Sequence, residues 1–438
     1  MKMSELKISK FIAAFDKYFW LRMFVFLGLL LSVWWMRFPF IFRKMYAEDG
    51  SLFLVDALRF KFPTDLIEPA AGYSTLIMRL GGRFVSIFPL ENAAIMGGLF
   101  TAICMSALAA GLFQYNNFNS QNFLSRLTLS LSFLFLPLAS FSAVGNIANL
   151  YVYFMTASAV FLYYHEKTLG ETFYKSFMLL VAALSLPLTI FLLPILLHRI
   201  YLDKKANGYL KILRSDVVFV TGLVSQFVFI AITSFGERAP NAPQSIFKVV
   251  YLYFERGIGI AIIPKWGFIS NTNGVIKYEN SIEILQSLQL RLIVVLVILA
   301  LFAFIFYRSI SKISWGMRSQ ICLIMALGFM YSILVGLFFN SEPRYMIFTS
   351  FLTCWAILLL LDSQGNSNLR FISTSYIIVV LVFGLTASIH RSQGPEWKPE
   401  VSKARQICIE SEKLEKVEIR TLPVDRIWNA KISCKNLR

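Results

Sequence analysis

The sequence predicts a polytopic α-helical membrane protein, and three observations carry that prediction. Of the 438 residues, 57% are hydrophobic and only 15% are charged, whereas about a quarter of the residues in a soluble domain are charged. Apolar runs recur along the chain, and each is long enough to cross a bilayer as a helix. These runs lack the period-two alternation that is typical of membrane β-strands.

The first span fixes the orientation of the chain. The segment before it is rich in Lys and Arg, which accumulate on the cytoplasmic side of membrane proteins. A span at 23–41 then places the loop 42–92 in the periplasm. Within this loop, Tyr73 to Phe88 has the apolar period of an amphipathic helix, which predicts a helix lying on the membrane surface with Arg79 and Arg83 on its polar face.

The remaining spans follow from hydropathy and from the distribution of basic residues. The run 177–197 contains Pro187 and Pro194 and precedes the most basic short loop of the chain. A proline-broken hairpin of two short helices returns that loop to the cytoplasm, as the charge rule requires. The other expected spans lie at 93–114, 127–144, 147–164, 217–234, 291–307, 319–339, 346–362 and 371–389. The total is 11 spans, or 10 if the proline-containing run crosses once.

The expected domain organisation puts every unusual polar segment on the outer face. A transmembrane domain covers 1–389 and includes a large periplasmic loop at 235–289, and 390–438 form a periplasmic tail. Cys408 and Cys434 lie in this polar tail, where the oxidising periplasm permits a disulfide between them. The inner loops are short and basic, as simple membrane anchors would be.

Composition and motifs exclude several classes of function. The formal net charge of +17 indicates contact with anionic lipid, because no basic helix or aromatic platform for nucleic acid accompanies it. No Walker loop, GxSxG element, Cys-x-x-Cys pair or HExxH motif is present, which argues against ATPases, serine hydrolases and zinc proteases. The three histidines are far apart and show no metal-ligand spacing.

Glu48 and Asp49 are the most informative residues, because the whole chain has only 25 acidic residues. Adjacent carboxylates at the outer end of a span are costly unless they act or are paired. They suit a general base or oxygen ligands for a divalent cation, so a metal cofactor stays open. The alternative is that Asp49 caps a helix beginning near Ser51, which explains one carboxylate and leaves the other without a role.

Other candidate site residues share the outer face with these acids. Each also has a structural alternative, such as headgroup contact, charge at a helix start or interfacial anchoring. Asp56 has an expected structural partner in Arg59, three residues further on. The candidate substrate-binding residues are Arg43, Glu68, Tyr73, Arg79, Arg344 and Tyr345.

The order of these features resembles the GT-C class of integral membrane glycosyltransferases: one span, an outer loop with paired acids, surface helices, then many spans. In that class an acid of the first outer loop is the catalytic base, which corresponds to Asp49 or Glu48 here. Arg344-Tyr345 is similar to a contact with the carrier phosphate. Within the class, length and composition are similar to phage-type serotype-converting O-antigen glucosyltransferases.

This resemblance implies a function at the periplasmic face of a bacterial inner membrane. The enzyme would move a sugar, glucose in the first instance, from an undecaprenyl-phosphate-linked donor to a lipid-linked O-antigen or related polysaccharide, with inversion at the anomeric carbon. A flippase and a polyprenyl-phosphate sugar synthase would be its functional partners. The alternatives are an O-antigen polymerase, a polysaccharide flippase or transporter, and a membrane protein without catalysis.

Overall fold

The computed structural model describes most of the chain. The described ranges are 17–70, 72–115, 123–136, 144–233, 246–254, 313–338, 343–363, 394–411, 413–422 and 428–437, with short pieces at 257, 270–272, 275–277, 300, 307, 371, 375 and 378. Most of two predicted spans, 291–307 and 371–389, and most of the loop 235–289 lie outside these residues, as does Glu342 beside Arg344.

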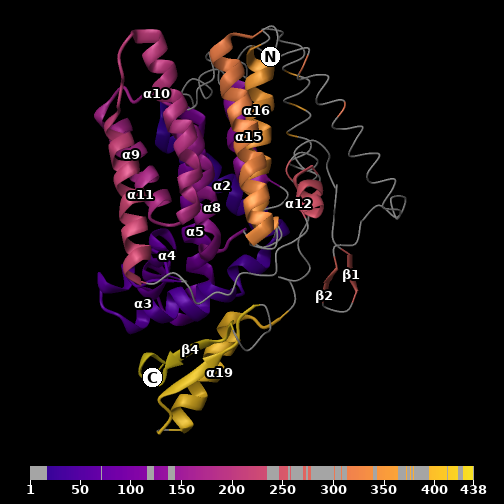
Figure 1. Ribbon diagram of the computed structural model, residues 1–438. Helices are drawn as coiled ribbons and strands as arrows, with labels where there is room; N and C mark the ends of the chain where they lie inside the picture. The colour runs from indigo at the N-terminus through magenta and orange to yellow at the C-terminus, as the bar shows by residue number, and fades with distance from the viewer. Residues whose placement is uncertain are drawn as a thin grey trace.

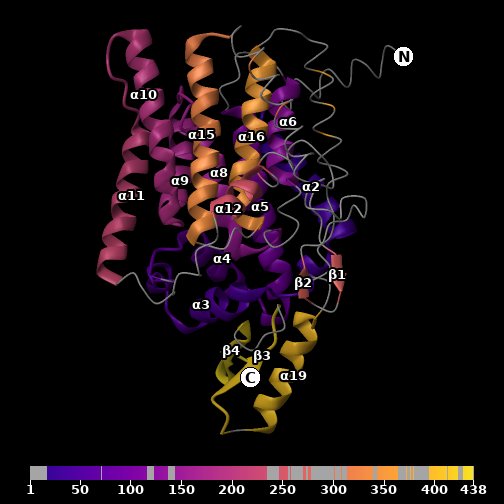
Figure 2. The same ribbon diagram turned by 45° about the vertical axis from the view of Figure 1, so that its right-hand side comes forward.

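Long helices form an upright bundle, and the short helices of the first loop lie across one end of it (Figure 1). The unit made of α19, β3 and β4 lies beyond that same end, which we call the outer end, and the tip of α10 marks the opposite, inner end (Figures 1 and 2). The bundle helices are α2 (Phe19–Arg37), α5 (Ala93–Gln114), α6 (Phe123–Phe135), α8 (Leu150–Phe161), α9 (Leu169–Ala183), α10 (Leu193–Asn207), α11 (Arg214–Thr233), α15 (Trp315–Phe338) and α16 (Pro343–Ser363).

Shorter elements connect these helices. The first loop contains η1 (Pro39–Phe42), the π-helical turn η2 (Asp49–Leu54), α3 (Val55–Arg59), η3 (Thr64–Leu66), α4 (Leu76–Ser86) and η4 (Leu90–Asn92). Further along the chain are η5 (Ile147–Asn149), η6 (Pro187–Leu192), α12 (Ile246–Leu252) and the antiparallel pair β1 (Ser270–Thr272) and β2 (Val275–Lys277).

Helix length and hydropathy make this a multi-pass membrane protein. Within the described part of the chain, 5 helices are long and apolar enough to cross a bilayer: Phe19–Arg37, Leu90–Gln114, Arg214–Thr233, Trp315–Leu337 and Arg344–Ser363. Two shorter apolar helices, Phe123–Phe135 and Ile147–Phe161, pack among them. The predicted total of 11 spans therefore stays a prediction.

The run around Pro187 is broken into two helices, as the prolines predict. Pro187 begins η6 and Pro194 is the second residue of α10, positions where a missing N–H breaks no helical hydrogen bond. At the outer end, the carbonyl of Leu184 accepts a hydrogen bond from the Leu76 N–H at the start of α4. At the inner end, His165 before α9 contacts Asp203 near the end of α10. The two helices therefore run in opposite directions as a hairpin.

Helix α4 lies across the outer end of the bundle (Figure 1), and its polar side is packed against other parts of the protein. Gly82 lies against the backbone of Phe53, so a Cβ there would come within 2.7 Å of the Phe53 carbonyl carbon. Gly81 lies as closely against Ile147, and Arg79 is only 1% exposed. The two glycines let η2 and η5 approach the helix, and the expected solvent-facing side becomes an internal contact.

The C-terminal residues form a folded unit. Helix α19 (Trp397–Glu410) packs on an antiparallel pair, β3 (Lys416–Ile419) and β4 (Ala430–Ser433), whose register pairs Val417 with Ile432. A disulfide joins Cys408 of α19 to Cys434, which follows β4 in η10 (Cys434–Asn436). The sequence indicated only a polar tail with two cysteines, because strands of four residues give a weak signal.

Candidate functional site at the outer end

Asp49 holds the first loop to the beginning of α8. Its Oδ2 accepts a hydrogen bond from the Ile147 N–H at 3.0 Å, and its Oδ1 accepts one from the Ala148 N–H at 2.7 Å. The side chain is 5% exposed. A carboxylate here meets backbone N–H groups and the positive end of the helix dipole, and it shares the Ala148 N–H with the Oδ1 of Asn146. The expected capping role is thus real, but the capped helix lies about a hundred residues further along the chain and does not begin at Ser51.

Glu48 differs from its neighbour. It is half-buried, and no hydrogen bond or ion pair to the described residues engages its carboxylate. Successive residues in a helical turn point about 100° apart, so Asp49 facing α8 leaves Glu48 facing elsewhere. Ala47, just before it, has φ of 32° in the left-handed region, where a non-glycine residue is strained. The chain therefore turns sharply immediately before the two acids.

The first turn of α8 also brings three other predicted residues together. Tyr151, the second residue of α8, lies near Tyr345, Arg344 and Tyr73. The guanidinium of Arg344 lies 5.2 Å from the centroid of the Tyr345 ring. Asp49 caps this same helix two to three residues earlier. One helix start therefore gathers Asp49, Tyr73, Arg344 and Tyr345 from separate parts of the sequence.

Tyr331 of α15 adds a polar group that sequence reasoning missed. It also lies near Tyr151. Its side chain is fully buried, and its hydroxyl has no hydrogen-bond partner in the described structure. A buried hydroxyl without a partner is unfavourable by about 1–3 kcal/mol. Such unsatisfied buried groups are found at positions that meet a polar ligand. A single Tyr in an apolar helix gave no sequence signal.

The two arginines of α4 lie outside this group. Arg79 pairs with Asp56, its Nη1 at 2.5 Å from Oδ2, and Arg83 pairs with Asp65 at 2.9 Å. The expected pair between Asp56 and Arg59 is therefore wrong, because the close packing of α3 on α4 puts Arg79 nearer. Both α4 arginines brace the first loop, which leaves little of Arg79 to meet a lipid phosphate.

Arg43 and Glu68 occupy the margins of the site. Arg43 is exposed and lies 3.7 Å from Glu396 at the start of α19. Glu68 is half-buried and pairs with no base among the described residues. The structure therefore places Arg43 toward the C-terminal unit.

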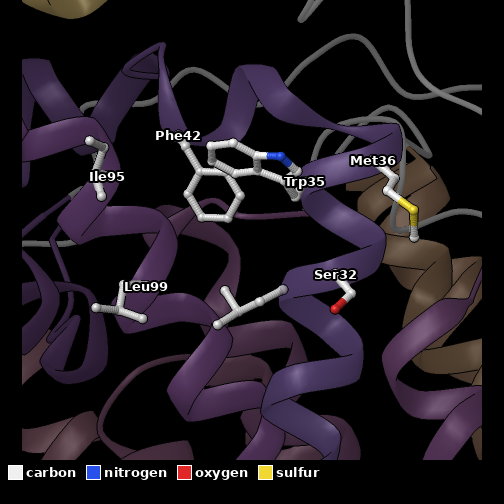
Figure 3. A pocket seen from close by; sticks show the side chains of 7 residues that line it. Ser32, Trp35, Met36, Phe42, Ile95 and Leu99 are labelled. Carbon is white, nitrogen blue, oxygen red and sulfur yellow. The ribbon is translucent and has the colours of Figure 1, made fainter.

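An apolar groove lies beside the outer end of α2 and runs onto α5. Its volume is about 700 Å³. In Figure 3 the rings of Trp35 and Phe42 lie together at its rim, with their centroids 6.0 Å apart. Seven residues line it: Leu31, Ser32, Trp35, Met36, Phe42, Ile95 and Leu99. In a membrane protein, such an apolar surface on the outside of two spans faces lipid.

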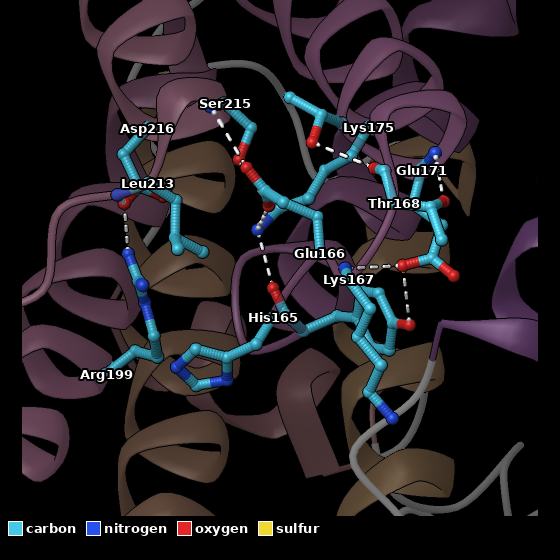
Figure 4. A network of polar contacts seen from close by, with 12 residues as sticks. His165, Glu166, Lys167, Thr168, Glu171, Lys175, Arg199, Leu213, Ser215 and Asp216 are labelled. Carbon is cyan, nitrogen blue, oxygen red and sulfur yellow. Dashed lines mark hydrogen bonds and ion pairs between the residues drawn. The ribbon is translucent and has the colours of Figure 1, made fainter.

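The inner end carries a polar network where the sequence predicted simple anchors (Figure 4). Arg199 is 1% exposed and bonds to both Asp203 and Asp216. Lys175, also 1% exposed, lies 3.2 Å from Glu166. The network joins the loop before α9 to helices α9, α10 and α11. The (i, i+4) spacing of Arg199 and Asp203 in the sequence indicates an ion pair on one helix and could have pointed to this network.

The same network includes a capping box at the start of α9. Thr168 accepts a hydrogen bond from the Glu171 N–H at 3.2 Å, and Glu171 accepts one from the Lys167 N–H at 2.7 Å. Burial raises the pKa of Glu166, but the Lys175 ammonium and the hydrogen bonds from Lys175 and Ser215 outweigh it and hold this pKa below its ordinary value. The inner loops are therefore rigid connections.

Comparisons with known proteins define no family. A scan against protein-family models matches none, and a search of the curated proteins finds no match. Among the described residues, no three His, Cys, Asp or Glu side chains gather in a group that could hold a metal ion. The fold and its hydropathy define the class: a multi-span helical membrane protein, with polar residues gathered at the outer end of the bundle and a polar network at the inner end (Figure 4).

Proposed function

We propose that this protein is a glycosyltransferase that moves a sugar, glucose in the first instance, from an undecaprenyl-phosphate donor to a lipid-linked O-antigen or related polysaccharide. The reaction takes place at the periplasmic face. The observation that carries the proposal is that Asp49 and a phosphate-binding candidate meet at the first turn of α8, with Glu48 directly preceding Asp49 in the chain. Asp49 caps that turn, and Arg344 and Tyr345 lie near Tyr151 within it.

The two acids divide the work in this proposal. Asp49 uses both oxygens to hold the loop against α8. Glu48 has a carboxylate that is partly exposed and outside any described hydrogen bond. A general base needs an oxygen within hydrogen-bond reach of the substrate proton. We therefore assign proton abstraction to Glu48 and the positioning of the loop to Asp49, reversing the order that the sequence alone suggested.

The transfer step is a direct displacement. Glu48 takes the proton of the acceptor hydroxyl, whose oxygen attacks the anomeric carbon of the donor sugar. The bond between that carbon and the phosphate oxygen breaks, and the polyprenyl phosphate leaves with the electron pair. Arg344 stabilises the negative charge that develops on the leaving phosphate. One displacement inverts the anomeric configuration and needs no protein nucleophile.

The groove between α2 and α5 suits the polyprenyl chain of the donor. It is apolar and large enough for several isoprene units, and Phe42 at its rim is six residues before Glu48. A chain lying in the groove would leave its phosphate at the outer end of the bundle. No other part of the donor requires a purely apolar surface.

The direct test is transfer of a labelled sugar in membranes that hold equal amounts of each variant. Glu48→Gln should abolish transfer, since an amide accepts no proton at neutral pH. Glu415→Gln, an exposed acid of the C-terminal unit, is the control and should be fully active. Full activity in a Glu48→Gln, Asp49→Asn double variant would rule out general-base catalysis by the carboxylates of this loop. Products with many repeat units in place of a single added sugar would favour the polymerase alternative.

A further inference from the structure

The C-terminal unit contacts the acidic loop directly, through its backbone. The Leu422 N–H donates a hydrogen bond to the Met45 carbonyl at 3.0 Å, and the Ala47 N–H donates one to the Leu422 carbonyl. These two bonds make a short parallel bridge between Tyr46 and Leu422. The bridge ends one residue before Glu48, so this contact sets where the chain enters the acidic pair.

Side-chain packing also holds the chain against the C-terminal unit just after the two acids. A Cβ at Gly50 would lie 2.9 Å from Cγ2 of Thr421 and 2.7 Å from Cγ of Met45. Gly50 therefore has no room for a side chain beside the C-terminal unit. Met45 and Gly50 are both held by residues 421 and 422, and Glu48 and Asp49 lie between them.

Three further contacts anchor the start of the unit to the first loop. The Trp397 N–H donates to the Arg43 carbonyl at 2.8 Å, and its indole N–H donates to the Leu90 carbonyl at 2.7 Å. Lys44 donates to the Gly394 carbonyl at 2.8 Å. Arg405 of α19 also pairs with Glu91. In sequence, the contacts lie both before and after the acidic pair. An element that sets the position of the pair needs contacts on both sides of it.

The disulfide connects these contacts within the unit. Cys408 lies in α19, the helix that begins at Trp397, and Cys434 directly follows β4. β4 pairs with β3, and the chain leaves β3 at Ile419 to reach Thr421 and Leu422. The bond therefore fixes the helix that anchors the unit relative to the edge that bridges to the acidic loop.

We propose that the C-terminal unit is a positioning element of the outer site: its Thr421–Leu422 edge, held by the Cys408–Cys434 disulfide, sets the conformation of Met45–Gly50 and so the position of Glu48. The strained φ of Ala47 fits this role, since a strained backbone persists only where its surroundings hold it. The catalytic consequence of the proposal rests on the proposed function, whereas the docking of the unit does not.

The first arm of the test measures docking by limited proteolysis of the purified full-length protein. Trypsin cleavage after Arg43 and Lys44 reports release, since both residues are held by the docked unit. Leu422→Pro removes the bridging N–H and should accelerate this cleavage about tenfold, as opening of a docked segment does. Leu422→Val keeps the N–H, and Lys413→Pro lies at an exposed turn of the same unit. Both controls should be cleaved at the wild-type rate.

The second arm separates positioning from general folding. Cys408→Ser with Cys434→Ser, and separately Leu422→Pro, should lower kcat of sugar transfer by about a hundredfold, as misplacement of a catalytic group does. The KM for the lipid-linked donor should stay within about twofold, because Arg344 and the groove are not touched. Leu422→Val, which keeps the bridging N–H, should have the kcat of the wild-type protein.

Two results would overturn the proposal: wild-type cleavage in the Leu422→Pro variant, or accelerated cleavage with unchanged kcat. Failure of the proposed function is distinguishable from both, because then the wild-type protein itself transfers no sugar. In that case the proteolysis arm still decides whether the unit holds Met45–Gly50.

Discussion

The carboxylate of Asp49 and the backbone amide of Ala148 are joined by a hydrogen bond of 2.7 Å across 99 positions of the sequence. This bond ties the loop after the first span to the start of a central helix. It explains how one acid of an adjacent pair is stabilised in a largely apolar protein. It also separates the pair into a buried, bonded member and a half-buried member, Glu48, that makes no described hydrogen bond.

Asp49→Asn should destabilise the protein more than Glu48→Gln does. The amide side chain offers one oxygen to two N–H groups. Asn146 Oδ1 also accepts from the Ala148 N–H at 3.1 Å, so the loss falls on the buried Ile147 N–H and costs about 1–3 kcal/mol. Glu48→Gln should change the free energy of unfolding by less than about 0.5 kcal/mol. Denaturant unfolding of both variants in detergent, at matched protein concentration, checks the difference. Equal losses would contradict the structural role of Asp49.

The helices of the bundle could be predicted from the sequence because hydropathy and proline placement determine a helix within its own stretch of sequence. The runs that became α2, α5, α11, α15 and α16 are visible as continuous apolar stretches. Pro187 broke its run into a hairpin for a local steric reason. The burial of α4 was not predictable, because it depends on Gly81 and Gly82 meeting residues that are distant in sequence.

The candidate site was predictable in part, for a similar reason. The acids and Arg344 stood out as rare polar groups between apolar runs. Their partners did not, because Asp49 bonds to the backbone of residues 147 and 148, and backbone amides leave no trace in sequence. Tyr331 and Leu422 were missed for the same reason: neither residue type signals a contact outside its own element.

Gly82→Ala should be strongly destabilising, whereas Gly28→Ala should not. A Cβ at Gly82 would overlap the backbone of Phe53, which cannot move as a flexible side chain does. Overpacking of this kind typically costs about 1–3 kcal/mol. At Gly28, within α2, nothing lies within 4 Å of the added Cβ, so alanine should stabilise the helix by up to about 1 kcal/mol. Thermal unfolding of the two variants, side by side, makes the comparison.

Asp56→Asn should weaken the first loop through Arg79. Arg79 is 1% exposed and is left without its counter-ion by this change. Breaking a buried pair by removing one partner costs about 3–5 kcal/mol. Arg59→Gln, on the same short helix but outside the pair, is the control and should change stability by less than about 0.5 kcal/mol. Protease resistance of loop 42–92 in membranes measures the effect, and equal resistance in both variants would contradict the assigned pairing.

The inner network should lose stability in acid through Glu166. Its pKa is lowered in the fold, so its contribution to the free energy of unfolding is complete above the unfolded-state pKa of about 4.3. That contribution disappears as the pH falls through the lower, folded-state pKa. Below about pH 4.3, Tm of the wild type should therefore fall more than Tm of Glu166→Gln, which should start lower at pH 7. Parallel pH profiles for the two proteins would show that Glu166 contributes nothing.

Filling the groove between α2 and α5 should impair use of a lipid-linked donor without affecting the acids. Leu99→Trp adds a large ring to the groove floor, opposite Trp35 and Phe42. If the polyprenyl chain lies there, the KM for donor should rise by about tenfold or more, because apolar burial contributes about 0.8 kcal/mol per CH₂ lost from the contact. kcat at saturating donor should stay near the wild-type value, since Glu48 and Arg344 are unchanged. Val220→Trp, on the exposed face of α11, controls for adding a ring to a lipid-facing surface. A donor KM equal in the two variants would place the chain elsewhere.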